Sequence, residues 1–478
     1  MPKPPKSSPA ESEFLFEIDP EPAPETLTSY AGAALLIRTL RSLGVPQSVA
    51  RHLHIKQRQR GYDEASFVES FVLLNGVGGE CLDDFEQLRA DAGLAELLGH
   101  ELPSPGAARN FLYEFHDGNQ VEAAKQERNL LGAVAYIPGE NGALSGLGEV
   151  NRDLVREVGR RCADQKIATV DQDATIIESR KREALRTYEG ERGYQPMLAV
   201  WAEMNLVLAD EFRDGNVPAA YQGLPVAKAA FATLPDSVKE YYFRGDSACH
   251  EHELIDWLRD EKRKDGPQGF IGFGISARMS GALRRAVEAV PDAGWEAYGK
   301  QDTESTRECA EVEFVPNEHS ERKETQPLRY VAIRIRQRQG GLLNDGSEAK
   351  HFAVVTNIRE WKPARLLQWH REKAGTIEAV HDVLKNELAA GVLPCGRFGA
   401  NAAWLRLAVM THNALTALKR LALPVELLQA RPKRLRFLYF NTAGRLVRHA
   451  RKTMLRLAMS VRRLAEFIEA LRLLPLRA

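Results

Sequence analysis

The chain has no long hydrophobic run, although 44% of its 478 residues are hydrophobic. A membrane-spanning helix needs roughly 20 predominantly apolar residues in a row, so the sequence predicts no membrane span. The amino-terminal stretch MPKPPKSSPAESEF lacks the apolar core of a signal peptide, and we expect no export by that route. These absences predict a cytoplasmic protein.

Cysteine is also scarce, and the five cysteines stand singly with no C-x-x-C pair. An odd number without paired spacing argues against a disulfide framework and predicts reduced thiols. The phosphate-binding motif GxxxxGK[ST] and the nucleophile-elbow motif GxSxG are both absent. The sequence therefore carries no signature of a P-loop nucleotidase or of an α/β-hydrolase.

Net charge is zero, with 65 basic and 65 acidic residues, but the charges are unevenly distributed. Residues 431–478 contain 13 Lys and Arg against two Glu, a net charge of +11. Residues 1–26 contain two Lys against one Asp and five Glu, a net charge of −4. A basic carboxyl-terminal segment predicts a polyanionic partner.

Hydrophobic periodicity changes along the chain from helical to strand-like and back to helical. Three strand patterns in succession, then a helix, then alternating strand and helix predict an α/β fold with a mixed sheet flanked by helices. Several short helices before residue 165 suit a bundle that docks DNA or a second subunit. The predicted segments are a disordered acidic tail (1–27), a helical domain (28–165), the first part of the core (166–294), a β-strand insertion (295–362), a helical second part of the core (363–425) and a basic helical carboxyl-terminal region (426–478).

The stretch TVDQDATII, residues 169–177, has the composition of a strand yet contains Asp171 and Asp173. Side chains alternate along a strand, so both carboxylates are expected on the same face. Ionised carboxylates are costly to desolvate. A cation that offsets their charge would explain the position of these acids.

A second acid, Asp246, follows the strand-like stretch EYYFRG at residues 240–245 and precedes a helix. Open α/β sheets bind ligands just beyond the carboxyl ends of their strands. The structural alternative is that Asp246 only caps the following helix. Gly245, directly before it, predicts a close approach between its backbone and another group.

A third acid, Glu378, shares one face of a predicted helix with His381 and Lys385, and Arg371 lies seven residues before it. A solvated amphipathic face is the structural alternative. Three carboxylates that converge from two strand ends and one helix would hold Mg²⁺, which prefers carboxylate oxygen and keeps water for a phosphate substrate. Two such ions can stabilise both oxygens in phosphoryl transfer.

The arrangement resembles the DDE transposases of bacterial insertion sequences. Asp173-Ala174-Thr175 is similar to the D-x-T motif of that family, and Arg244-Gly245-Asp246-Ser247 is similar to its second-Asp motif. Glu378 and Lys385 have the spacing of the Glu-containing helix motif. The strand-rich segment between Asp246 and Glu378 resembles the β insertion of one subgroup. The likeness runs through residues 166–420 and includes part of the amino-terminal helical region.

The resemblance implies an RNase H-like, retroviral-integrase-like core in which Asp173, Asp246 and Glu378 bind two Mg²⁺ (or Mn²⁺) ions. The implied function is cleavage of phosphodiesters at the ends of an insertion sequence and strand transfer into target DNA. Implied partners are double-stranded DNA, as terminal inverted repeats and as target, and a second copy of the chain; the implied location is the bacterial nucleoid. The implied DNA-binding residues are Lys385, Arg371, His381, Lys373, Arg213 and Asn216.

Two departures from the family pattern leave alternatives open. Arg371 and Ala374 stand where the family usually has Tyr and Arg, so either Lys373 or Arg371 is expected to supply the positive charge. Asp171 is an alternative metal ligand to Asp173, or a hydrogen-bond partner of the residues around the metal. Alternative functions are a metal-dependent nuclease of the same fold without strand transfer, and a DNA-binding protein without catalysis.

Overall fold

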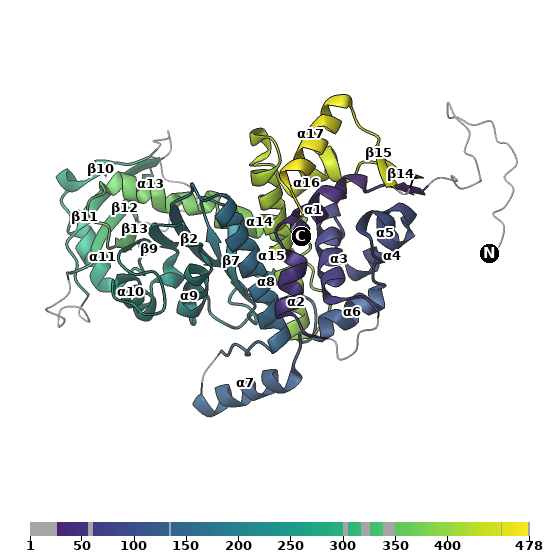
Figure 1. The fold of residues 1–478 in the computed structure, drawn as a ribbon. Helices are drawn as coiled ribbons and strands as arrows, with labels where there is room; N and C mark the ends of the chain where they lie inside the picture. The colour runs from purple at the N-terminus through teal and green to yellow at the C-terminus, as the bar shows by residue number, and fades with distance from the viewer. Residues whose placement is uncertain are drawn as a thin grey trace, which may run out of the picture.

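The protein is described by a computed structural model that covers residues 26–55, 61–132, 135–299, 305–316, 326–337, 349–450 and 452–476. A large mixed sheet fills one half of the molecule, and a bundle of helices fills the other (Figure 1). Most of the predicted acidic tail lies outside the described residues, and Thr26 and Leu27 at its end belong to a short strand, β1 (Thr26–Thr28).

Within the described residues, nine strands form the large sheet in the order β10-β11-β12-β13-β9-β8-β2-β6-β7. β2 runs parallel to β8 and antiparallel to β6, and β8 runs parallel to β9. The predicted α/β class with a mixed sheet is therefore confirmed. The strands are β2 (Ile167–Ala174), β6 (Met197–Trp201), β7 (Leu206–Glu211), β8 (Glu240–Gly245), β9 (Ile271–Ser276), β10 (Glu296–Ala297), β11 (Ser305–Val312), β12 (Arg329–Gln337) and β13 (Ala349–Thr356).

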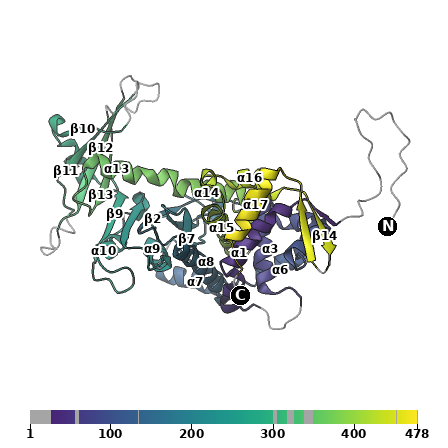
Figure 2. The same ribbon diagram turned by 45° about the horizontal axis from the view of Figure 1, so that its top comes forward.

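The strand-rich segment predicted as an insertion continues the same sheet. β11, β12 and β13 pair antiparallel in sequence order, and β13 pairs antiparallel with β9. These strands therefore extend the sheet away from β2 and β8 toward one end of the molecule (Figures 1 and 2).

Helices cover both faces of the sheet around β2 and β8. On one face, the side-chain amide of Gln172 in β2 donates to the carbonyl of Gly223 at the start of α9 (Gly223–Thr233). On the other face, the hydroxyl of Thr376, which precedes α14 (Ile377–Glu387), donates to Asp171 of β2. Neighbouring residues of one strand thus contact opposite layers, as strand geometry requires.

The helical half of the molecule surrounds α15 (Phe398–Leu421), of which nearly every residue is buried. α15 packs against both the amino-terminal helices and β7, and so joins the two halves. Ser104 caps α6 through the amide of Ala107, with Pro105 at the first helical position, as its sequence predicts. The helices before the sheet are α1 (Ala34–Ser42), α2 (Val45–His52), α3 (Glu64–Val77), α4 (Phe85–Ala90), α5 (Ala92–Leu98), α6 (Pro105–Tyr113), α7 (Gly118–Leu131) and α8 (Gly142–Arg161).

None of the helices in the described ranges combines the length and the apolar character that crossing a membrane would require.

The prediction that the region after residue 426 is helical was wrong in part. β14 (Gly444–His449) and β15 (Lys452–Leu457) form a hairpin, and β14 also pairs with β1 from the other end of the chain. The hairpin is followed by α17 (Val461–Leu473), which is helical as predicted. Apolar residues at helical spacing suggested one continuous helical region, but the pairing with β1, more than 400 residues away in sequence, stabilises strands instead.

Candidate active site

Two of the three predicted acids lie at the carboxyl ends of neighbouring parallel strands. Gln172 of β2 lies opposite Gly245 of β8, so Asp173 and Asp246 are the next residues of the two strands in register. Adjacent strands lie roughly 4.8 Å apart, which brings the two acids to the same edge of the sheet. The carboxylate of Asp246 also accepts a hydrogen bond of 2.9 Å from the amide of Ala248. Asp246 therefore lies at the strand end and also caps the next turn.

Glu378 lies on the first turn of α14, and its side chain is exposed. Lys385, seven residues later, donates a hydrogen bond of 3.0 Å to the hydroxyl of Thr175, two residues beyond Asp173. Residues seven apart occupy nearly the same side of a helix. This side of α14 therefore faces the carboxyl end of β2, where Asp173 lies.

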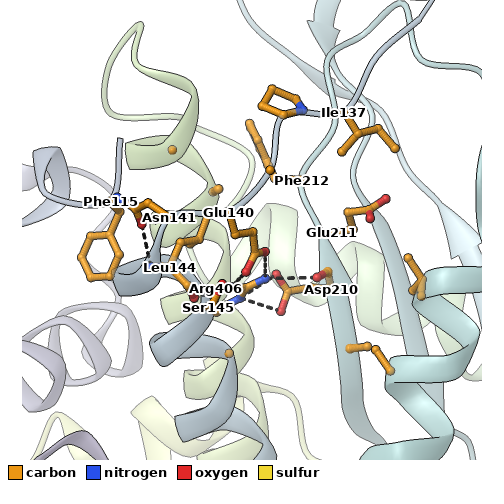
Figure 3. A pocket seen from close by; sticks show the side chains of 18 of the residues that line it. Phe115, Ile137, Glu140, Asn141, Leu144, Ser145, Asp210, Glu211, Phe212 and Arg406 are labelled. Atoms are coloured by element: carbon orange, nitrogen blue, oxygen red, sulfur yellow. Dashed lines mark hydrogen bonds and ion pairs between the residues drawn. The ribbon is translucent and has the colours of Figure 1, made fainter. Parts of the chain in front are cut away.

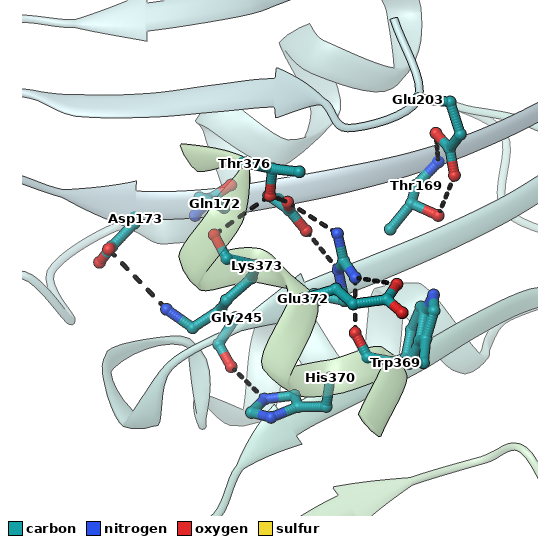
Figure 4. Close-up of polar contacts among 12 residues, drawn as sticks. Thr169, Gln172, Asp173, Glu203, Gly245, Trp369, His370, Glu372, Lys373 and Thr376 are labelled. Carbon is teal, nitrogen blue, oxygen red and sulfur yellow. Dashed lines mark hydrogen bonds and ion pairs between the residues drawn. The ribbon is translucent and has the colours of Figure 1, made fainter. Parts of the chain in front are cut away.

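The pKa of Asp173 reports the proximity of the other two acids. This pKa is raised to about 6, chiefly by burial; the negative charges of Asp246 and Glu378 also act to raise it, and the positive charge of Lys373 acts to lower it. The ammonium of Lys373 lies 3.8 Å from the carboxylate of Asp173, as Figure 4 shows. The side chain of Asp173 remains 19% exposed. Three like charges thus act on one another beside the ammonium group of Lys373.

Among the residues that the structure describes, no three acidic, histidine or cysteine side chains lie close enough together to hold a metal ion. The three carboxylates influence one another electrostatically without sharing one coordination point. Their chemistry nevertheless fits a hard cation, since each supplies carboxylate oxygen and each keeps surface exposed to solvent. A bound cation would also relieve the mutual repulsion that raises the pKa of Asp173.

Asp171 does not contribute a further solvent-accessible carboxylate to this group of acids. Its side chain is fully buried and accepts two hydrogen bonds from Arg244, at 2.6 and 2.9 Å, and one from the hydroxyl of Thr376. Protein donors thus occupy the carboxylate of Asp171. β2 passes from buried to partly exposed between Gln172 and Asp173, so only Asp173 reaches solvent. Asp173, and not Asp171, therefore offers a solvent-accessible carboxylate to a cation.

Arg244 and Thr376 are residues to which sequence reasoning gave no role. Arg244 also donates to the carbonyl of Trp369 at 2.5 Å, and its guanidinium lies 5.3 Å from the Trp369 ring centre. His370 bonds to the carbonyl of Gly245 at 3.0 Å (Figure 4). One signal was available, because Arg244 interrupts an apolar strand pattern, as Asp171 does in β2. These contacts attach the segment before Glu378 to the strand before Asp246.

The predicted DNA-binding residues separate into two groups. Lys373 and Lys385 lie beside the carboxylates, as described above. Arg371 is exposed, and its charge acts to lower the pKa of Tyr298, which burial raises. Arg371 therefore extends toward the strands of the insertion.

Two of the other three predicted DNA contacts, His381 and Arg213, are buried. Burial, together with the nearby charges of Lys385 and Lys373, lowers the pKa of His381 to about 3, so its imidazole is neutral and cannot pair with phosphate as a cation. Arg213 has no exposed surface, because Glu211 and the carbonyls of Tyr221 and Gln222 hold its guanidinium. Asn216 is half-buried in the turn that follows β7. Both residues belong to the stretch FRDGN, residues 212–216, in which folding turns Arg213 inward.

A cavity of about 520 Å³ lies elsewhere, between α8, β7 and α15 (Figure 3). Arg406 of α15 forms ion pairs there with Glu140 at 2.7 Å and with Asp210 at 3.0 Å. Desolvation alone would lower the pKa of Arg406, but the two carboxylates raise it above its ordinary value. Arg406 of α15 thus links the segment before α8 to β7, and we assign this group a structural role in joining the two halves.

Comparison with known proteins identifies one family. The family described as Transposase DDE domain group 1 matches residues 18–478, which is nearly the whole chain. No curated protein matches the sequence. Among solved structures, one similar chain belongs to the "Cryo-EM structure of piggyBac transposase synaptic complex with hairpin DNA", with 11% sequence identity and a TM-score of 0.44 over 85% of this chain and 78% of that chain.

Proposed function

We propose that Asp173, Asp246 and Glu378 form the catalytic centre of this chain, which belongs to the group 1 family of DDE transposase domains and is a DNA transposase. The observation that carries the proposal is the register of β2 and β8, which brings Asp173 and Asp246 to the ends of adjacent strands. The contact between Lys385 and Thr175 supports the placement of Glu378 on the same side.

We propose that the three carboxylates hold two divalent cations, Mg²⁺ or Mn²⁺. When bound, such ions supply an activated water and stabilise charge on the phosphodiester that is cleaved. The partly exposed carboxylates support this role because carboxylate oxygen is the ligand that these ions prefer. Lys373 and Lys385 would bind phosphate oxygens beside the acids, since each carries its ammonium to the same end of β2.

The strand order of the large sheet supports a proposal for the fold of the core. In the five-strand part β7-β6-β2-β8-β9, antiparallel pairing on one side of β2 changes to parallel pairing on the other. This arrangement supports an RNase H-like core, to which β10–β13 are added as an extension. The segments at 28–165 and 426–478 would then serve DNA binding or dimerisation.

We further propose that the substrate ends are the terminal inverted repeats of a bacterial insertion sequence, and that a homodimer brings two such ends together in the nucleoid. The freed 3′-hydroxyl would attack a phosphodiester of target DNA by in-line displacement. Such a step needs positioning and charge stabilisation and no protein nucleophile. The basic segment after residue 431 supports a DNA partner for these steps.

The test uses a supercoiled plasmid that carries the gene's own flanking DNA on both sides of a marker, incubated with the protein and Mg²⁺ or Mn²⁺. We expect cleaved and joined products from the wild type. Asp173→Asn and Glu378→Gln should each lower cleavage by more than roughly 100-fold, which exceeds the loss expected from residues that only orient a metal ligand. Both variants should retain duplex binding.

A matched control is Asp382→Asn, which removes an exposed carboxylate from the same helix as Glu378. Asp382 pairs with Arg431 at 2.7 Å and has no part in the proposed centre, so cleavage should stay close to the wild-type rate. Cleaved but unjoined DNA from the wild type would favour a nuclease without strand transfer. Duplex binding with no cleavage by the wild type with either metal would favour a silent DNA-binding protein, and equal losses in E378Q and D382N would refute the assignment of Glu378.

A further inference from the structure

A small cavity lies behind the helix that carries Glu378. It has a volume of about 220 Å³ and lies between the turn from β6 to β7, the start of α14, the end of α15 and residues 429–435. α14 contacts both α15 and α16 (Pro432–Leu435), and the three helices lie together in Figures 1 and 2. Pockets for drug-sized molecules measure roughly 300–1,000 Å³. This cavity therefore suits a small ion or water molecules.

A lysine ammonium group is buried beside this cavity without an acid to pair with it. Lys419 of α15 is 7% exposed and donates a hydrogen bond of 3.2 Å to the carbonyl of Ala430. No carboxylate of the described residues forms an ion pair with it. Its pKa is lowered to about 8, chiefly by burial and also by the charge of Arg420, so it is mostly charged at pH 7. Burying such a charge is costly, and an anion in the cavity would offset the cost.

A buried hydroxyl lies one turn before Lys419 on the same side of α15. Thr416 lines the cavity and is 2% exposed, and its hydroxyl has no hydrogen-bond partner among the described residues. His412, a further turn earlier, already bonds to the carbonyl of Asn205 at 3.1 Å. Native proteins rarely leave a buried polar group unpaired. The hydroxyl of Thr416 is therefore available to donate to a bound group.

Another wall of the cavity is formed by the amino-terminal end of α14. Gly375, Thr376 and Ala379 line the cavity, and the helix begins at Ile377. No side chain caps its first turn. The amino-terminal end of a helix carries partial positive charge and unpaired amides, and it favours a bound anion. The helix end, the buried ammonium and the buried hydroxyl thus border one small space.

The remaining charged residues of the cavity wall leave this space positive. Three basic residues, Lys419, Arg420 and Arg431, line it together with one acid, Glu203. The carboxylate of Glu203 accepts hydrogen bonds of 2.9 and 2.6 Å from the amide and the hydroxyl of Thr169. Arg420 donates to two backbone carbonyls, and Arg431 pairs with acids outside the cavity. Lys419 therefore supplies the charge that most needs a counter-ion.

We propose that this cavity is a binding site for a small oxyanion such as inorganic phosphate, held by the ammonium of Lys419, the hydroxyl of Thr416 and the amino-terminal end of α14. The occupant is a free ion and not a phosphate of the DNA backbone, because Lys419 and Thr416 are both more than nine-tenths buried. A bound anion would connect α15 to the start of α14 without taking part in cleavage. The proposal does not depend on the catalytic role of Glu378.

The test measures equilibrium binding of radiolabelled inorganic phosphate to the whole protein by dialysis in a phosphate-free buffer at constant ionic strength. We expect saturable uptake of one phosphate per chain by the wild type. Lys419→Met removes a charged donor and should weaken binding by about 10–100-fold. Thr416→Val removes a neutral donor while keeping the shape of the side chain, and should weaken binding by about 2–10-fold.

Two matched variants control for the loss of a lysine and of a hydroxyl. Lys433→Met removes an exposed lysine of α16 that does not line the cavity. Thr411→Val removes a hydroxyl of α15 that donates to the carbonyl of Leu407 at 2.8 Å, also away from the cavity. Both should bind phosphate with the wild-type affinity. Thr416→Val keeps the proposal testable if Lys419→Met does not fold.

The possible outcomes support or overturn the proposal as follows. A wild-type Kd weaker than about 1 mM would assign the cavity to water and overturn it. Equal losses in K419M and K433M would place the phosphate on the exposed basic surface, with the same consequence. Displacement of the label by sulfate supports a free oxyanion, whereas displacement by duplex DNA would overturn that choice. None of these outcomes depends on DNA cleavage, so each leaves the proposed function to its own test.

Discussion

Asp171 and Arg244 lie directly opposite each other on the parallel strands β2 and β8 and form a two-pronged ion pair, with N–O distances of 2.6 and 2.9 Å. Their side chains are 0% and 3% exposed. Thr376, two residues before Glu378, donates to the same carboxylate. One buried pair therefore connects the strands that lead to Asp173 and Asp246 with the start of the helix that carries Glu378.

Removing one partner of this pair should destabilise the protein strongly. Asp171→Ala leaves the Arg244 guanidinium buried without its main counter-charge, which typically costs about 3–5 kcal/mol. Urea denaturation should show a loss of that size in the free energy of unfolding. Glu372→Gln is the control, because Glu372 lies 3.6 Å from Arg244 and is 59% exposed. It should change the free energy by less than about 1 kcal/mol, and similar losses in both variants would contradict the prediction.

Thr376→Val should impair catalysis more than folding. The valine keeps the shape of the side chain but removes the hydroxyl that ties the start of α14 to Asp171. We expect cleavage to fall roughly 10–100-fold, the range for groups that orient metal ligands. The fall should appear in kcat, with KM for DNA little changed.

Thr376→Ser restores the hydroxyl and should recover most of the wild-type rate. A valine variant with wild-type kcat would show that the contact has no positioning role. Loss of activity in the serine variant as well would point to packing of the threonine methyl group.

The free energy of unfolding should depend on the protonation of His412 at acidic pH. The pKa of this histidine is lowered to about 4, chiefly by burial and also by the charge of Lys419, while its bond to the carbonyl of Asn205 acts to raise it. An unfolded histidine has a pKa near 6.5, so below that pH the unfolded chain takes up the proton first. Its contribution to stability is therefore complete above pH 6.5 and is lost as the pH falls toward 4.

The expected loss from this group is about 3 kcal/mol between pH 7 and pH 4. His412→Gln removes the titrating group, so the difference in unfolding free energy between wild type and variant should change by about that amount over the range. Urea denaturation at several pH values measures the difference. A difference that stays constant with pH would refute the prediction.

Gly245→Ala should disturb the strand end that carries Asp246. A Cβ at Gly245 would lie 2.5 Å from the Cβ and 2.6 Å from the sulfur of Cys249, so one of the two segments must shift. Overpacking of this kind typically costs about 1–3 kcal/mol. The melting temperature and the rate of DNA cleavage should both be reduced.

Gly375→Ala is the matched control for this substitution. Gly375 lies in the turn before α14, and no atom lies within 4 Å of a Cβ placed there. Its free energy of unfolding should stay within about 0.5 kcal/mol of the wild type. A wild-type melting temperature for the Gly245 variant would contradict the prediction.

Local patterns in the sequence were sufficient to predict most of the strands in the part of the large sheet around β2. The stretches around β2, β6, β7, β8 and β9 have apolar runs of strand length between turn residues, and the strands form there. The three acids and the Glu378–Lys385 spacing could also be picked out from sequence. Their roles in cation binding and catalysis stay predictions.

Distant contacts could not be read from those patterns. The alternation in β2 predicted that Asp171 and Asp173 share a face, but it contained no information that Arg244 and Thr376 would enclose the first and leave the second near solvent. In the same way, the spacing that groups His381 with Glu378 and Lys385 did not show that His381 is buried.

The spacing of residues along the chain thus suffices to predict which residues share a strand face or a helix face, because side-chain direction repeats with the local backbone geometry. Burial, ion pairing and the conversion of residues 444–457 from expected helix to hairpin depend instead on partners from remote parts of the chain, such as β1 at residues 26–28. Those partners meet only after folding, and the free energy of their contacts outweighs weak local preferences.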